Sequence, residues 1–305
     1  MINPDFFVTK DQAEDFTNKG FLLLKNFYKS EFISYLQATI DDRIDTPTDK
    51  YQSGFSRLAF DMYEDDPVIS SAIQNHNFKK VMRQLTNRNM FFAQALSFEL
   101  ERNLNKGFPW HIGTQSFGYH RAEDYGCTIW APLVEIDPQG QRGGMAYVPK
   151  NMVSGNFMYS HVDPAIFDLL SARIQAGEET TTEYFVQLRD GPLNDGVMKD
   201  LLGHFSVEDR FEVGDALIFD KNVIHRSIML NSGPLERRAA FVMRFFCETS
   251  RYDKKRAHAL EIPRDHFNYA GPTRFHLQVA ENDGDLLVES ERFANQPYRA
   301  LKHKG

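Results

Sequence analysis

Cysteine is scarce in this sequence, and long apolar runs are missing from it. Only two cysteines occur among 305 residues, and each of them, Cys127 and Cys247, lies inside an apolar run that is typical of a strand. We therefore expect buried free thiols rather than a disulfide, and a reducing, cytoplasmic setting. No segment approaches the roughly 18 apolar residues of a membrane-spanning helix, and the N-terminus lacks the features of a signal peptide. The sequence thus predicts a soluble protein with no membrane partner.

Basic residues are also fewer than acidic ones. The formal net charge is −7, and no run of basic residues occurs before the C-terminal end. Two short basic clusters, at residues 251–256 and 299–305, are expected to be solvated surface. This charge balance argues against nucleic acid or an anionic membrane as the main partner.

The remaining composition is that of an ordinary folded chain, with 42% hydrophobic and 25% charged residues, which suits one large domain. The first part of the chain predicts helices at residues 9–20, 29–44 and within 66–88. A short apolar strand, residues 21–27, is expected between the first two.

From about residue 88 the pattern changes to short strands rich in aromatic and β-branched residues, separated by turn signals. The expected strands are residues 90–100, 127–136, 143–150, 210–220, 223–230 and 237–246. Helices followed by many short strands predict an α+β fold built on an antiparallel β-sandwich or barrel. We expect a single domain over residues 1–305, with its core at about 88–250 and an irregular tail after Cys247.

More than fifty residues, about 151–204, interrupt the series of strands. A helix is expected at 163–179 and a polar stretch around 188–196. Inserts of this size on a strand scaffold are commonly lids over a binding site, and the alternative is a surface decoration.

Two of the ten histidines stand out as candidate metal ligands. His111 in "FPWH" and His225 in "NVIH" each follow an apolar or aromatic residue at the edge of an expected strand. Two imidazoles that face one interior suit Fe(II) better than a closed structural zinc site. A carboxylate two residues after the first histidine would complete a 2-His-1-carboxylate face, but the residue there is Gly113.

The order of the motifs resembles the phytanoyl-CoA dioxygenase branch of the Fe(II)/2-oxoglutarate oxygenases. It runs from "WH" through a strand with Trp130, a Gly-Gly turn into "MAYVP", and "VGDALIFD" to His225 and an arginine-containing strand. The resemblance extends over about residues 11–246 and implies a double-stranded β-helix, a jelly-roll or cupin-like core. With Gly113, the chain is most similar to the Fe(II)/2-oxoglutarate halogenases, including those that act on acyl groups attached to carrier proteins.

This resemblance implies a role for each matching position. His111 and His225 would bind iron, and chloride would occupy the place that Gly113 leaves open, supplying both a ligand and a negative charge. Arg238 would hold 2-oxoglutarate beside Thr128 and Trp130, and Arg244 would help to fix the halide.

The alternation of strand residues places Arg238, Ala240, Val242 and Arg244 on one face, which favours Arg238 over Arg237. The alternative for these arginines is an outward-facing charged edge.

The implied reaction uses O2 to decarboxylate 2-oxoglutarate and chlorinates an unactivated carbon of an acyl substrate. The chain has no Asp-Ser-Leu attachment site for phosphopantetheine. A tethered substrate would therefore come on a separate acyl carrier protein, and a free small molecule is the other possibility.

Three alternatives accompany this interpretation. His161-Val162-Asp163 is a literal His-x-Asp step, which would make the protein an ordinary hydroxylase, although Asp163 is better explained as a helix cap. Glu123 or Asp124 could instead supply a carboxylate to the metal. Finally, Gly113 could mark a non-catalytic β-helix binding module.

Overall fold

The computed structural model describes residues 2–45, 54–114, 116–267 and 274–302. In these residues two antiparallel sheets form, one with the strand order β1-β6-β4-β8-β3-β2 and one of β5 and β7. The strands are β1 (Phe21–Leu24), β2 (Arg57–Met62), β3 (Met90–Glu101), β4 (Gly126–Pro132), β5 (Met145–Tyr147), β6 (Ala216–Asp220), β7 (His225–Ser227) and β8 (Arg237–Cys247). A large and a small antiparallel sheet form the double-stranded β-helix, so the predicted fold class is confirmed.

Both faces of the large sheet are covered, which explains why its strands read as nearly continuous apolar runs. In β8, Phe241 and Met243 pack into a core shared with the N-terminal helices. The alternate residues Ala240 and Val242 pack on the other face with Trp130 of β4. Because successive side chains point to opposite faces of a strand, the β8 residues on the face toward the small sheet can contribute to a site between the two sheets.

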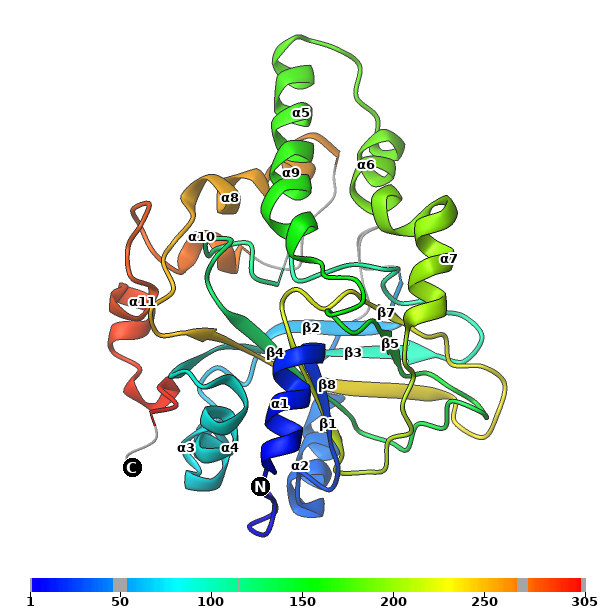
Figure 1. The fold of residues 1–305 in the computed structure, drawn as a ribbon, viewed down its shortest axis with the longest axis vertical. Helices are drawn as coiled ribbons and strands as arrows, with labels where there is room; N and C mark the ends of the chain where they lie inside the picture. Colours follow the sequence, from blue (N-terminus) through cyan, green and yellow to red (C-terminus); the bar gives the residue numbers. More distant parts are fainter. Residues whose placement is uncertain (1, 46–53, 115, 268–273, 303–305) are drawn as a thin grey trace.

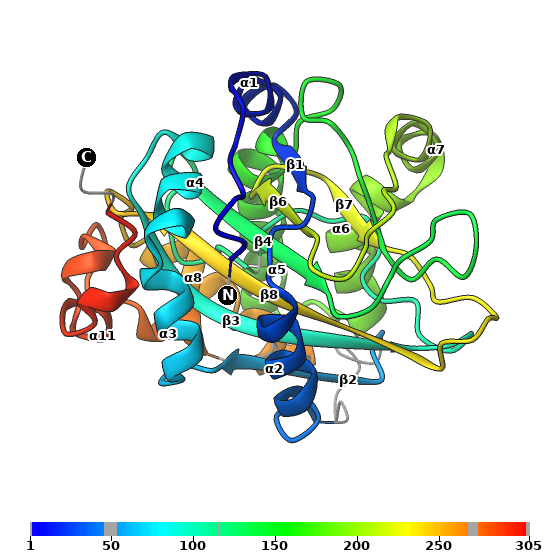
Figure 2. The ribbon, with the colours of Figure 1, turned by 90° about the horizontal axis from the view of Figure 1, so that it is seen from below.

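Helices from the first third of the chain cover the outer face of the large sheet (Figure 2). They are α1 (Lys10–Lys19), α2 (Ser30–Ile40), α3 (Pro67–Gln74) and α4 (His76–Thr86). The first begins with a capping box at Thr9 and ends at Gly20 with φ of 80°, as the sequence predicts. The helix expected within 66–88 is two helices, because the Asn75 side chain accepts from the Phe78 N–H at 3.1 Å and starts a new one.

Helices of the insertion stand above the sheets (Figure 1). A π-helical turn, η1 (Met158–Val162), leads into α5 (Asp163–Gln175), which is followed by α6 (Thr182–Asn194) and α7 (Gly196–Phe205). We refer to residues 151–204 as the lid segment. Helix α5 agrees with the sequence, but the polar stretch at 188–196 lies largely within α6, and α7 was not predicted.

Several other expectations were wrong. The strand expected at 210–220 covers only Ala216–Asp220, because a turn with φ of 101° at Gly214 precedes it, and β2 was not expected. The tail is not irregular but forms short helical elements. These are α8 (Lys254–Ala259), α9 (Ile262–Phe267), α10 (Phe275–Gln278), η2 (Leu287–Glu289), α11 (Glu291–Ala294) and η3 (Pro297–Arg299).

The C-terminal basic cluster is not simply surface. The Arg299 side chain is 1% exposed, donates to the Ala93 carbonyl at 2.7 Å and pairs with Glu64 at 3.1 Å, while residues 303–305 of that cluster lie outside the described residues.

Cys127 and Cys247 are buried and free, as predicted. Among the described helices, none is long and apolar enough to cross a membrane.

Candidate metal and anion site

His111 and His225 face each other across a short antiparallel bridge. The N–H of each residue donates to the carbonyl of the other at 2.9 Å, and the centroids of the two rings are 4.2 Å apart. Each Nδ1 lies against a backbone carbonyl, that of Pro109 at 2.7 Å and that of Val223 at 2.9 Å. Because a carbonyl can only accept, both Nδ1 atoms carry the proton and both Nε2 atoms keep a lone pair for a metal.

The electrostatics of the two rings favour the neutral form that a metal requires. Both rings border a cavity but are enclosed by protein, and this desolvation lowers the pKa of His111 to about 4 and the pKa of His225 well below its usual value. The positive charges of Arg189 and Arg244 lower the pKa of His111 further. Near neutral pH the Nε2 atoms therefore carry no proton that a metal would have to displace.

All seven predicted site residues line one cavity of about 150 Å³. They are His111, Gly113, Thr128, Trp130, His225, Arg238 and Arg244. They come from β4, β7, β8 and the loop before β4, and in the ladder of β4 and β8 Thr128 lies opposite Arg244. The structure therefore brings the predicted constellation together, while the role of each residue stays a prediction.

Gly113 has a packing reason of its own. Its N–H donates to the Lys221 carbonyl at 3.0 Å. A Cβ at this position would lie 2.8 Å from Cδ2 of Phe117 and 3.0 Å from the Lys221 carbonyl oxygen. In the described part of the chain, no group of three or more His, Cys, Asp or Glu residues could hold a metal. The two imidazoles, with their Nδ1 atoms against backbone carbonyls and their rings beside the cavity, fit a metal that also binds ligands from the cavity.

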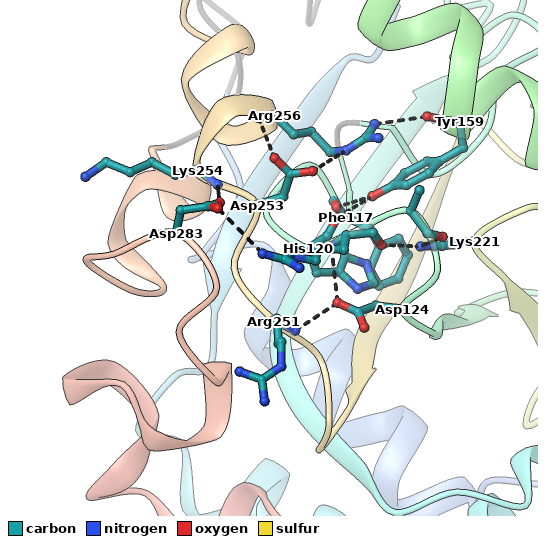
Figure 3. Close-up of polar contacts among 12 residues, drawn as sticks. Phe117, His120, Asp124, Tyr159, Lys221, Arg251, Asp253, Lys254, Arg256 and Asp283 are labelled. Carbon is teal, nitrogen blue, oxygen red and sulfur yellow. Dashed lines mark hydrogen bonds and ion pairs between the residues drawn. The ribbon is translucent and has the colours of Figure 1, made fainter.

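The loop that carries Gly113 is fixed to the lid segment by a buried tyrosine (Figure 3). The Tyr159 hydroxyl donates to the Phe117 carbonyl at 2.6 Å. Lys221 Nζ and Arg256 Cζ each lie 4.2 Å from the centroid of the Tyr159 ring, within the range of a cation–π contact. Lys221 also donates to two carbonyls of this loop, at 2.9 and 3.0 Å, so the loop geometry beside His111 is held from several sides.

Arg238 and Arg237 separate as strand alternation predicts. The Arg237 side chain is 56% exposed and lies 3.9 Å from Glu99, whereas Arg238 is 2% exposed and lines the cavity. Within the part of the chain that the structure describes, Nε of Arg238 makes no hydrogen bond. Burial lowers the pKa of Arg238 to about 9. A buried guanidinium that opens on a cavity is suited to a carboxylate ligand.

Arg244 and Trp130 complete this end of the cavity. Nη1 of Arg244 donates to Oε1 of Gln94 at 2.7 Å, and Gln94 donates in turn to Asp61 at 2.6 Å. The Trp130 ring lies 5.5 Å from Cζ of Arg238. Arg244 is therefore oriented by the neighbouring strand, and Trp130 supplies a flat wall beside the buried guanidinium.

The His161-x-Asp163 alternative is not supported by the geometry. His161 is exposed, with its ring centroid 5.6 Å from that of Phe157, while Asp163 is buried and lines the cavity. Asp163 is also no helix cap, since α5 has no side-chain cap. Its carboxylate accepts a hydrogen bond from the Thr114 hydroxyl instead.

Asp163 gives a pH-dependent prediction. Burial raises its pKa from 3.8 to about 6, so the folded state loses stability as the pH rises from about 4 to 6 and this group ionises. Asp163→Asn keeps an acceptor for Thr114 and should stabilise the protein by about 1–3 kcal/mol near pH 7.5. Urea unfolding at about pH 7.5 and pH 5 checks this, because the gain should shrink at the lower pH. A gain of equal size at both values would contradict it.

Glu123 and Asp124 do not border the cavity. Glu123 is exposed beside a separate surface depression. Asp124 accepts from the N–H groups of Arg121 at 3.2 Å and Arg251 at 2.8 Å, so it fixes the turn rather than reaching the histidines.

Sequence reasoning missed several residues that line the cavity. Lys221 lies four residues before His225, and Arg189 lies in the polar stretch expected around 188–196. Phe55, Phe98 and Phe108 form an aromatic wall, with ring centroids 4.8 to 5.8 Å apart, and Phe108 lies 5.3 Å from the His111 ring. No local pattern marks such a wall, because its rings come from different segments.

The lid segment is joined to the metal-binding region by Asn194 of α6. Its Oδ1 accepts from the Trp110 N–H at 2.9 Å, and its Nδ2 donates to the Trp110 carbonyl at 2.8 Å. Trp110 directly precedes His111, so this two-point contact fixes the position of α6 relative to the histidine pair.

Comparisons with known proteins identify the fold. No family model matches the chain, and no curated protein matches it. Solved structures do match. They include the non-haem, α-ketoglutarate-dependent carbocyclase SnoK from nogalamycin biosynthesis, with a TM-score of 0.57, 12% identity, and coverage of 82% of this chain and 89% of that one.

The epimerase SnoN from the same biosynthesis has a TM-score of 0.56 at 12% identity, over 81% of this chain and 85% of that one. EctD from S. alaskensis with bound Fe has a TM-score of 0.56 at 16% identity, over 83% and 82%. At such identities the likeness shows the fold alone. The chain thus has the double-stranded β-helix fold that these iron enzymes share.

Proposed function

We propose that this protein is an Fe(II)- and 2-oxoglutarate-dependent oxidoreductase. The observation that carries the proposal is the pair of neutral imidazoles whose Nε2 atoms are available beside a cavity that also contains a buried guanidinium. The similar structures include SnoN in complex with Fe3+ and α-ketoglutarate. This complex supports iron and 2-oxoglutarate as the two groups that bind here.

The residues that line the cavity would have separate binding roles. His111 and His225 would hold the iron through Nε2, and Arg238 would hold the distal carboxylate of 2-oxoglutarate beside Thr128 and Trp130. With O2, iron and 2-oxoglutarate supply the oxidising power that removes a hydrogen atom from an unactivated carbon. The aromatic wall and the lid segment would exclude water and orient that carbon. Through this exclusion and orientation the protein would increase the reaction rate.

We further propose that a halide completes the iron site and is transferred to the substrate. Support comes from the two imidazoles with available Nε2 atoms and from Arg244, a cation at the same end of the cavity as Thr128. An anion in the third position would restore the charge that a carboxylate normally provides. The alternative outcome is hydroxylation. An acyl carrier protein as partner, and cytoplasmic localisation, stay predictions.

The halide proposal has a spectroscopic test that needs no substrate. Chloride added anaerobically to the protein with Fe(II) and 2-oxoglutarate should shift the absorbance of the iron complex. Gly113→Asp should abolish that shift by placing a tethered carboxylate at the metal. Gly113→Ala is the matched control, since it adds the same crowding against Phe117 and Lys221 without a charge.

Two results would separate the possibilities. A wild-type spectrum that ignores saturating chloride, with only hydroxylated product after O2 is admitted, would leave an oxygenase with an unusual ligand set. Equal loss of the chloride response in Gly113→Ala and Gly113→Asp would show that packing alone explains the glycine. Failure to bind iron and 2-oxoglutarate at all would favour the non-catalytic binding module.

A further inference from the structure

The cavity carries more positive than negative charge, although the chain as a whole is acidic. Its wall contains four basic side chains and two carboxylates. The basic side chains are Arg189, Lys221, Arg238 and Arg244, and the carboxylates are Asp163 and Asp190. Burial lowers the pKa of Lys221 to about 7, so the three arginines carry the excess of positive charge. Enclosing charge without compensation is costly, so a wall of this kind is suited to anionic ligands.

Three of the four basic side chains serve the proposed 2-oxoglutarate site or the loop and strand around it. Arg238 would meet 2-oxoglutarate, Lys221 donates to two loop carbonyls, and Arg244 donates to Gln94. Arg189 is the fourth. It lies on α6 of the lid segment and not on the β-helix, and its charge acts on His111. An anion held there would lie on the lid side of the metal pair.

Arg189 is held by a local contact that a ligand could replace. Its Nε and Nη2 donate to the carboxylate of the next residue, Asp190, at 2.5 and 2.6 Å. Adjacent residues on a helix do not face each other, and Cζ of Arg189 also lies 5.5 Å from the centroid of the Phe185 ring, so the guanidinium lies back along α6. The two side chains are 23% and 22% exposed, and the planar guanidinium can donate to a carboxylate in the cavity in the same bidentate manner.

The rest of the wall is apolar. The rings of Phe55, Phe98 and Phe108 line one side, and Ile166, Phe167 and Leu193 line it from the lid segment. We propose that the substrate is a free apolar carboxylic acid, whose carboxylate binds Arg189 and whose hydrocarbon part packs on these side chains. This inference rests on the proposed function. It is an alternative to the carrier-bound acyl group that the sequence predicts, because a thioester has no carboxylate to offer Arg189.

The test measures binding without turnover. Hexanoate, octanoate and 4-phenylbutanoate, with their methyl esters and the octanoyl thioester of N-acetylcysteamine, are titrated anaerobically by calorimetry into the protein loaded with Fe(II) and 2-oxoglutarate. Wild type should bind at least one acid ten-fold or more tightly than its methyl ester. Arg189→Met should remove that preference, and Arg189→Lys should keep part of it, because the charge remains but the fork is lost.

Two further variants separate recognition from misfolding. Asp190→Asn should bind the acid more tightly than wild type, since the competing carboxylate is gone, and a gain of affinity cannot come from unfolding. Arg173→Met is the matched control: Arg173 also lies on the lid segment, pairs with Glu178 at 3.1 Å and lies over Tyr184, and it does not line the cavity. This variant should bind like wild type.

The inference is overturned if acids and esters bind wild type equally, if the thioester binds and no acid does, or if Arg173→Met and Arg189→Met lose affinity alike. Failure of the underlying function has a different signature. In that case the absorbance of the iron and 2-oxoglutarate complex would not form in wild type before any acid is added.

Discussion

Ferrous iron binding should disappear when either His111 or His225 is replaced by alanine. Each ring would contribute its Nε2, because its Nδ1 lies against a backbone carbonyl. Replacing a residue that only hydrogen-bonds to a metal ligand costs 10–100-fold in metal affinity, so loss of one of the two proposed imidazole ligands should cost more than about 100-fold. The measurement is iron retained per chain after anaerobic reconstitution and gel filtration, together with the absorbance of the 2-oxoglutarate complex.

His161→Ala serves as the control for this result. His161 is exposed on the π-helical turn and contacts the Phe157 ring in a tilted arrangement, so its removal should leave iron binding and absorbance close to wild type. If His161→Ala lost iron while His111→Ala retained it, the assigned pair would be wrong and the His161-x-Asp163 step would have to be reconsidered.

Strand periodicity made the inner face of the site predictable. The alternation in β8 separates Arg238 from Arg237 because successive side chains take opposite faces, and the structure buries the first and exposes the second. Likewise, the apolar residues before His111 and His225 predict a strand edge for both, and the structure places His225 at the start of β7 and His111 in an isolated bridge opposite it. Short-range patterns suffice here, since the backbone period alone determines the face.

Features that depend on distant segments were not predictable in this way. The crowding at Gly113 involves the Lys221 carbonyl, more than a hundred residues away, so the sequence offered only the missing carboxylate as a reason for the glycine. The role of Asp163 was misjudged for a similar reason: a Pro at the next position is typical of a helix start, but the partner of the carboxylate is Thr114 in a distant loop.

Binding of 2-oxoglutarate should be lost in Arg238→Met, which keeps an apolar side chain but removes the guanidinium. Truncating one partner of a buried charged pair typically costs about 2–5 kcal/mol, which corresponds to roughly 30- to 5,000-fold in affinity. Arg237→Met is the matched control, one residue away on the exposed face, and should bind 2-oxoglutarate like wild type. Titration by calorimetry in the presence of Fe(II) measures both.

Thermal unfolding distinguishes this loss from a folding defect. Burial of Arg238 disfavours its charged form, so the ligand-free Arg238→Met protein should be at least as stable as wild type. A ligand present at 100 times its Kd stabilises a protein by about 2.7 kcal/mol, and 2-oxoglutarate should give this gain in wild type and Arg237→Met but not in Arg238→Met. Equal stabilisation of all three would show that the co-substrate is held by another cation of the cavity, and a less stable ligand-free Arg238→Met would show that the guanidinium serves the fold.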